Sequence, residues 1–84
     1  MTPIWFEVIA VDDTLERFSF IVTSFYLSHE KDGWTVVVGS YGDIDTYHFG
    51  EDEAKARALY TALDELKMTG GTIRFDEERG TVLE

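Results

Sequence analysis

The sequence predicts an α+β fold in which one helix packs on a curved, mostly antiparallel sheet of five to six strands. Apolar and polar residues alternate through most of the first fifty positions, and a single strong helical period follows them. The alternating pattern then returns, which gives the element order ββββαβ(β), the last strand being short. Residues 1–84 are expected to form one domain, because a chain of this length can build one core of its own.

Four strands are expected before the helix, separated by short connections. Residues 12–16 form a polar link, residues 29–33 form a hairpin loop that ends in a glycine able to take positive φ, and residues 41–43 form a tight turn. Short connections of this kind join antiparallel neighbours. The expected strands are Ile4–Val11, Arg17–Leu27, Trp34–Gly39 and Ile44–Phe49.

The helix is expected over Glu51–Met68, where apolar residues recur at helical spacing and form one stripe. Gly50 is the expected N-cap, the acids of the first turn suit the positive end of the helix dipole, and Gly70 suits the left-handed position after the last turn. The stripe consists of Ala56, Leu59, Tyr60, Leu63 and Leu66, and the expected i,i+4 ion pairs are Glu51 with Lys55 and Glu53 with Arg57.

A strand pattern returns after the helix. The residues from Thr72 to Asp76 alternate again, residues 77–80 form a turn that ends in glycine, and Thr81–Leu83 is the expected last strand. These strands complete the predicted sheet.

The first two strands carry apolar residues on both faces, which a sheet covered by one helix does not need. In the second strand, Phe20 and Val22 lie on one face, whereas Ile21 and Phe25 lie on the other. A single helical stripe cannot cover both faces. Two interpretations stay open: the sheet curls around its own side chains, or its second face meets another molecule.

The charge balance is the strongest functional signal in the sequence. Seventeen Asp and Glu stand against seven Lys and Arg, giving a net charge of −10, yet 44% of the residues are hydrophobic. The chain is therefore a folded domain with a negative surface, and not a disordered acidic tail. Such a surface repels nucleic acid and anionic lipid and attracts basic protein surfaces.

We expect a small non-enzymatic binding protein, an inhibitor or nucleic-acid mimic that occludes a basic surface of a nucleic-acid-handling protein or complex. It is similar in type to anti-CRISPR proteins, which are phage inhibitors of host defence, and to immunity proteins, since all are short, acidic and free of cysteine. The expected partner-binding residues are Asp12, Asp13, Glu16, Glu30, Asp32, Asp43, Asp45, Glu51, Asp52, Glu53, Asp76, Glu77 and Glu78, with Tyr41 and Trp34 as aromatic anchors.

Two other functions fit the same residues. The chain could be a structural module that homodimerises, or docks into an assembly, through the second apolar face of its sheet. It could also bind a small molecule in a curved sheet, with Trp5, Trp34 and Tyr47 lining the pocket.

No catalytic, metal-binding or cofactor-binding motif is recognisable in the sequence. There is no cysteine, which removes disulfides, thiolate zinc sites and cysteine nucleophiles. The Asp12-Asp13-x-x-Glu16 segment lacks the glycine and the regular spacing of a calcium loop, and neither His29 nor His48 has a nucleophile motif beside it. We therefore expect no enzymatic activity and no cofactor.

The sequence predicts a cytoplasmic chain without a membrane partner. Its first residues lack the basic segment of a secretory signal, and its apolar runs are too short to span a bilayer. The absence of cysteine fits a reducing compartment.

Overall fold

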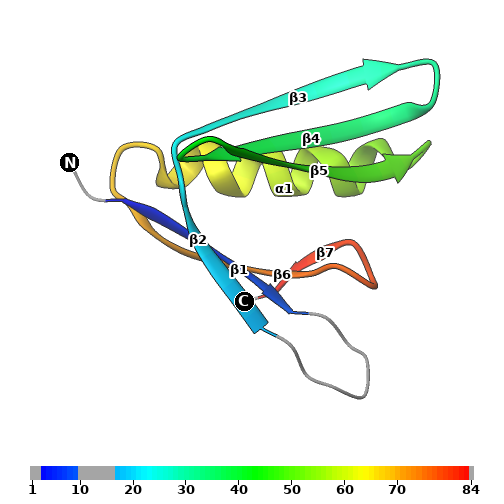
Figure 1. Cartoon of the computed structure of the whole chain (residues 1–84). Helices are drawn as coiled ribbons and strands as arrows, with labels where there is room; N and C mark the ends of the chain where they lie inside the picture. The colour runs from blue at the N-terminus through cyan, green and yellow to red at the C-terminus, as the bar shows by residue number, and fades with distance from the viewer. Residues whose placement is uncertain (1–2, 10–16, 84) are drawn as a thin grey trace.

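The computed structural model describes residues 3–9 and 17–83, and within them it shows seven strands in two sheets with one helix (Figure 1). The α+β class is therefore confirmed. The four-stranded sheet has the order β2-β1-β6-β7, and the three-stranded sheet has the order β3-β4-β5. The elements are β1 (Ile4–Ile9), β2 (Arg17–Val22), β3 (Ser24–Glu30), β4 (Gly33–Ser40), β5 (Asp43–Gly50), α1 (Glu53–Leu66), β6 (Gly71–Asp76) and β7 (Thr81–Leu83).

Two sheets replace the single curved sheet that the sequence predicts, and one strand pair is parallel. Within the described residues, four of the five strand pairs are antiparallel, whereas β1 and β6 run parallel. The chain between β1 and β6 passes through β2, the three-stranded sheet and α1, and this long connection allows the two strands to run in the same direction. Short connections could not have joined these strands in the same direction.

The predicted strand Arg17–Leu27 is in fact two strands that belong to different sheets. The break falls at Thr23, whose backbone N–H and Oγ1 both donate to the Gly39 carbonyl oxygen, at 2.8 Å and 3.0 Å. The break also shifts the alternation by one residue. Phe20 of β2 and Phe25 of β3, expected on opposite faces of one strand, therefore pack against the same core.

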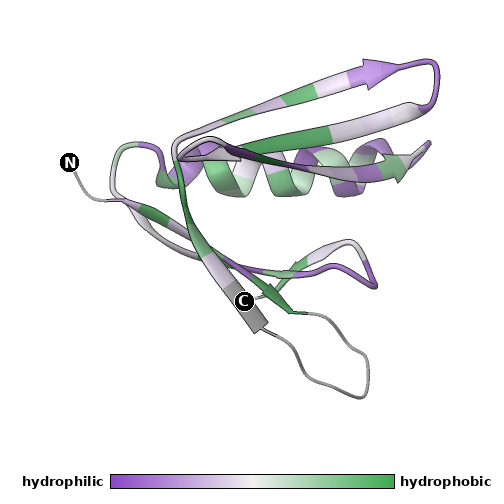
Figure 2. Cartoon of the chain, in the orientation of Figure 1, coloured by the Kyte–Doolittle hydropathy of each residue, from purple (hydrophilic) through white to green (hydrophobic). Residues whose placement is uncertain are grey.

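One buried cluster joins both sheets to the helix. Phe6 lies at its centre, with its ring stacked on Phe20 at 5.3 Å and on Tyr47 at 5.5 Å between centroids. Figure 2 shows the apolar positions of the helix alternating with polar ones, which is the predicted stripe. The buried residues are Ile4, Phe6, Val8, Val36, Val38, Tyr47, Ala56, Leu59, Leu63, Ile73 and Phe75.

The helix is shorter than predicted and has a different cap. Asp52, not Gly50, is the N-cap, and its side chain accepts a hydrogen bond from the Lys55 backbone N–H at 3.1 Å. A carboxylate is a stronger cap than glycine because it satisfies a backbone donor of the first turn. After the last turn, Gly70 has a φ of 73° and donates to the Leu66 carbonyl at 2.7 Å, as the sequence predicts.

The core stripe of the helix gives the first prediction. Leu63 is fully buried, whereas Thr61 on the same helix is exposed. We expect Leu63→Ala to lower the free energy of unfolding by about 2–5 kcal/mol, because it leaves a cavity, and Thr61→Ala to change it by less than about 0.5 kcal/mol. Urea unfolding followed by circular dichroism measures both, and equal losses would contradict the packing described here.

Candidate interaction surface

The acidic clusters do not form one patch, because β4 separates them. In the three-stranded sheet Trp34 pairs with Gly50, while Ser40 pairs with Asp43. The β3–β4 hairpin tip and the β5–α1 junction therefore share one end of this sheet, and the β4–β5 turn lies at the other end. Eight residues of β4 place the two ends about 25 Å apart.

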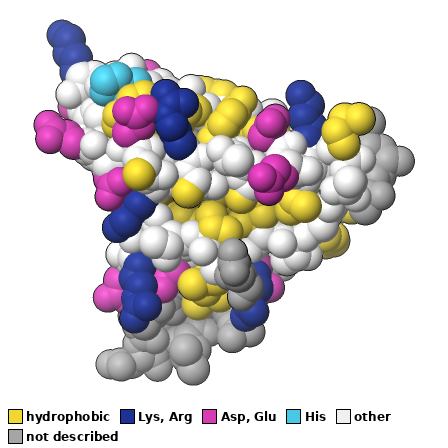
Figure 3. Space-filling view, turned by 180° about the vertical axis from the view of Figure 1, so that it is seen from behind, with side chains coloured by type: hydrophobic (Ala, Val, Ile, Leu, Met, Phe, Trp, Pro, Cys, Tyr) yellow, Lys and Arg dark blue, Asp and Glu magenta, His cyan; other side chains and the backbone are white. Residues whose placement is uncertain are grey.

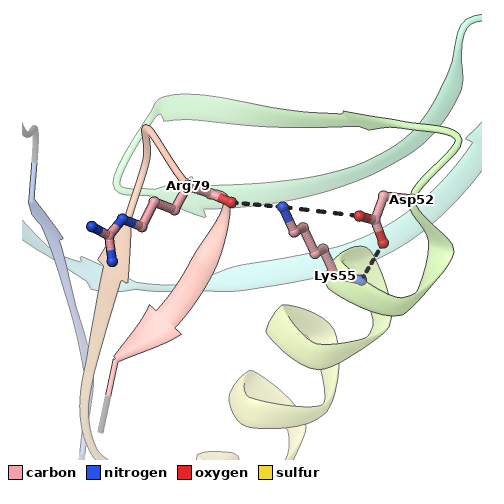
Figure 4. Close-up of polar contacts among 3 residues, drawn as sticks. All are labelled: Asp52, Lys55 and Arg79. Atoms are coloured by element: carbon pink, nitrogen blue, oxygen red, sulfur yellow. Dashed lines mark hydrogen bonds and ion pairs between the residues drawn. The ribbon is translucent and has the colours of Figure 1, made fainter.

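Four exposed carboxylates gather at the first of these ends, and no described cation lies within ion-pair distance of them. Two come from the hairpin tip, one from the β5–α1 junction and one from the β6–β7 turn. The β6–β7 turn belongs to this end because the Lys55 Nζ of the helix donates to the Arg79 carbonyl at 2.9 Å (Figure 4). We call this surface the acidic end, defined by Glu30, Asp32, Glu51 and Glu78.

The cations near the acidic end are mostly engaged by other groups. Lys55 lies 3.9 Å from the N-cap carboxylate of Asp52, which replaces the predicted pair with Glu51 (Figure 4). Arg57 pairs with Glu53, as predicted from the sequence. Both cations therefore neutralise acids at the start of the helix. The predicted partner-binding residues Asp52 and Glu53 are engaged in these ion pairs and stabilise the helix N-terminus.

Lys31 is the remaining cation of this end with no ion pair among the described residues. It sits at the tip of the hairpin, between Glu30 and Asp32, and all three side chains are exposed. One lysine cannot offset the four carboxylates that define the acidic end. The surface therefore keeps a negative excess.

Trp34 is not the exposed anchor that the sequence predicts. Its ring is half-buried and stacks on the His29 imidazole, with centroids 4.2 Å apart and planes 9° from parallel. The Arg57 guanidinium carbon lies 5.2 Å from the same ring, in the position of a cation–π contact. His29, expected in a loop, lies in β3. These contacts fasten the hairpin tip to the helix, so the acids of the tip are held in place.

Asp76, which the sequence groups with the exposed acids, is buried, with 4% of its surface accessible. Its Oδ1 accepts the Arg79 backbone N–H at 3.1 Å, and its Oδ2 lies 3.8 Å from the Arg79 Nε. Its carbonyl oxygen accepts from Gly80 at 2.8 Å. Asp76 therefore shapes the β6–β7 turn. Its neighbours Glu77 and Glu78 are exposed.

The other predicted residues lie at the opposite end of the three-stranded sheet or outside the described residues. Tyr41 is 77% exposed in the β4–β5 turn, and it has a φ of 35°, a value that few residues other than glycine adopt. Asp43 is exposed and Asp45 half-buried on the same face of β5. Asp12, Asp13 and Glu16 lie outside the described residues.

Tyr47 is a buried polar group without a hydrogen-bond partner among the described residues. Its hydroxyl is enclosed by the core, where the ring packs edge-on against Phe75. Burial raises the pKa of this hydroxyl well above its usual range, and the nearby charges of Asp45 and Glu77 raise it further. Trp5, Trp34 and Tyr47 do not line either of the two main pockets of the described residues: Tyr47 is buried in the core, and Trp34 packs against that core and stacks on His29.

Over residues 3–9 and 17–83, no group of three or more His, Asp or Glu side chains is arranged to hold a metal ion. In the same residues, no helix combines the length and the hydropathy of a membrane span.

Comparison with models of protein families, with curated protein sequences and with solved structures found no significant match.

The buried turn carboxylate gives a prediction with a close control. We expect Asp76→Ala to lower the free energy of unfolding by about 1.5–3 kcal/mol, because it removes a buried acceptor that serves a backbone N–H and a guanidinium. Glu78→Ala, two residues away and exposed, should change it by less than about 0.5 kcal/mol. Chemical denaturation of both variants tests the assignment, which fails if Asp76→Ala is as mild as Glu78→Ala.

The unpartnered hydroxyl of Tyr47 gives a pH-dependent prediction. Near neutral pH, Tyr47→Phe should stabilise the fold by about 1–3 kcal/mol, because it removes a buried donor that lacks an acceptor. Unfolded tyrosine ionises near pH 10, while folded Tyr47 keeps its proton, so the wild type loses stability as pH rises beyond about 10.

The variant lacks this loss, and the gap between the two proteins should therefore widen in alkali. Urea unfolding at about pH 8 and about pH 11 measures both effects. A constant gap between the two pH values would show that Tyr47 ionises freely in the fold.

Proposed function

We propose that the chain is a small non-enzymatic binding protein whose acidic end occludes a basic surface of a nucleic-acid-handling protein or complex. The observation that carries this proposal is the gathering of Glu30, Asp32, Glu51 and Glu78, all exposed and all without an ion pair among the described residues. Carboxylates held together in this way repel one another and destabilise the fold slightly. A basic partner removes that repulsion.

The acidic end is preorganised, which supports binding over mere solubility. Gly33 at the hairpin tip lies so close to Gly50 that an added Cβ would stand 2.3 Å from the Gly50 carbonyl oxygen. Together with the stack of His29 on Trp34, this contact fixes the hairpin tip against the β5–α1 junction. A surface whose charges are already positioned loses little conformational entropy when it binds.

The class of partner follows from the sign and the spacing of the charge. Proteins that hold nucleic acid present Lys and Arg along a phosphate track, and duplex DNA offers them one negative charge per roughly 1.7 Å of helix axis. Carboxylates from three separate elements can occupy such a track in place of phosphates. The mechanism is steric and electrostatic occlusion, with association accelerated by the negative field and slowed by salt.

The experiment compares two variants that remove equal charge from different places. Glu30→Gln with Asp32→Asn neutralises the hairpin part of the acidic end, and Asp43→Asn with Glu65→Gln neutralises exposed acids outside it. Binding to a fluorescent arginine-rich peptide, and displacement of short duplex DNA from a basic DNA-binding domain, are measured by anisotropy. We expect the first pair to weaken binding about tenfold and the second to weaken it far less.

The salt dependence of the affinity, measured in the same experiment, is the second test. The affinity of the wild type should fall by at least about tenfold between about 50 mM and about 200 mM salt. Equal losses for the two double variants would show that net charge alone attracts the peptide, and a salt-independent affinity would remove the electrostatic mechanism.

An assembly module that docks through the outer face of a sheet is the second candidate. The outer face of the three-stranded sheet is free of charge over most of its area, and Tyr26 stands on it with 57% of its surface exposed. Three strands of this length present only about 370 Å². This is less than half of the ~800 Å² per partner that a stable interface buries, so the face suits a transient contact.

A further inference from the structure

An apolar groove lies at the end of the molecule opposite the acidic end. It has a volume of about 730 Å³ and runs between the β2–β3 bend and the C-terminal half of α1. A groove of this size is large enough for several side chains of a partner. Its apolar walls come from Ile21, Val22, Phe25, Tyr41, Tyr60 and Met68.

Large apolar side chains stand exposed around this groove. Met68 is 88% exposed and Tyr41 77%, and both line the groove. Trp5, 43% exposed, lies beside Ile21 of the groove wall. In Figure 3, hydrophobic side chains cross the middle of the molecule toward the right, where a few charged side chains stand beside them, while most charged side chains gather on the left. We call this surface the apolar end, defined by Trp5, Ile21, Tyr41 and Met68.

The apolar end is as large as the largest apolar patch that a typical monomeric protein exposes, and patches of this size often mark an interface. Its exposed side chains together present on the order of 400 Å² of apolar surface, and the groove walls add to it. The exposed side chains alone supply about half of the ~800 Å² that each partner buries in a stable interface, and the groove walls supply part of the rest. The charge-free outer face of the three-stranded sheet offers less than half of that area.

The charges in the groove wall indicate which partner fits. Asp64 and Lys67 both line the groove, both are exposed, and neither forms an ion pair among the described residues. They lie three positions apart near the end of the same helix. A two-fold axis between them would place Asp64 of one copy opposite Lys67 of the other, and the reverse, because a two-fold interface is self-complementary.

Net charge restricts where two copies can meet. Each chain carries −10, so most face-to-face arrangements bring carboxylates together. Contact through the apolar end turns both acidic ends outward, about 25 Å or more from the contact. At that distance, salt screens most of the repulsion.

We propose that the apolar end is a self-association surface that seats a second copy of the chain in a two-fold dimer. Met68 and Tyr41 of each copy enter the groove of the other, and Asp64 pairs with Lys67 across the axis. The dimer is independent of the proposed binding function. It leaves both acidic ends accessible.

Sedimentation velocity from about 10 µM to about 1 mM tests the dimer, with Met68→Gln as the first variant. Met68 is almost fully exposed, so this change leaves the core intact. We expect the wild type to shift from monomer to dimer across the range, and the variant to need at least about tenfold more protein. A wild type that stays monomeric throughout would overturn the proposal.

A charge-swap series locates the axis. Asp64→Lys alone and Lys67→Asp alone each place like charges opposite one another and should weaken the dimer. The double variant restores both pairs and the original net charge, so it should recover most of the lost affinity. Failure of the double variant to recover, with circular dichroism unchanged, would remove the proposed two-fold arrangement.

Tyr26→Ser is the matched control, because Tyr26 is an exposed aromatic residue on the outer sheet face, outside the apolar end. We expect it to leave the dimer unchanged. A dimer that Tyr26→Ser disrupts, and that Met68→Gln does not, would move the interface to the sheet face and overturn the proposal.

Discussion

The break at Thr23 is the constraint on which the rest of the structure depends. One residue with two hydrogen bonds to Gly39 redirects the chain from one sheet to the other and shifts the side-chain alternation by one position. Phe20 and Phe25 then face one core instead of two surfaces. The shift accounts for part of the excess of apolar residues in this part of the sequence, since Phe20 and Phe25, expected on two faces of one strand, pack against a single cluster, whereas Ile21 stays outside it. The same bend also forms one wall of the apolar groove.

The length of the three-stranded sheet separates two kinds of surface. The four acids of the acidic end lie where the hairpin tip, the helix start and the β6–β7 turn meet. The apolar side chains lie where the β4–β5 turn and the helix C-terminus meet, with Asp43 and Asp64 as the exposed acids beside them. The separation has a physical advantage, because fewer unpaired carboxylates then stand near an apolar contact and have to be desolvated. At about 25 Å, each surface can bind without changing the solvation of the other.

Local patterns predicted local structure well. The helical stripe, the i,i+4 pair of Glu53 with Arg57 and the left-handed Gly70 are all found, because each depends on residues a few positions apart. The break at Thr23 could not be predicted in this way. Residues 17–27 read as one strand, with no glycine or proline to mark an interruption, and the partner that creates the break is Gly39, sixteen residues away.

The candidate site was predictable in composition and not in position. The sequence places acids in turns, but only strand register shows which turns share an end. The predicted exposure of Asp76 and Trp34 is wrong for the same reason. Asp76 is buried in its own turn, and Trp34 stacks on His29 of the neighbouring strand β3. The groove beside Lys67 and Met68 could not be predicted from the sequence, because its opposite wall is formed by the β2–β3 bend, more than forty positions earlier in the chain.

One of the two tryptophans of the chain lies near the acidic end and the other at the apolar end, so the intrinsic fluorescence of the protein can report on both surfaces. Trp34 belongs to the hairpin that carries acids of the acidic end, and Trp5 lies beside the groove, partly in water. Replacing either one by phenylalanine leaves a single indole, whose emission responds to the solvent around one surface only. Occupation of each surface can therefore be followed separately in solution, without attaching a dye to a protein this small.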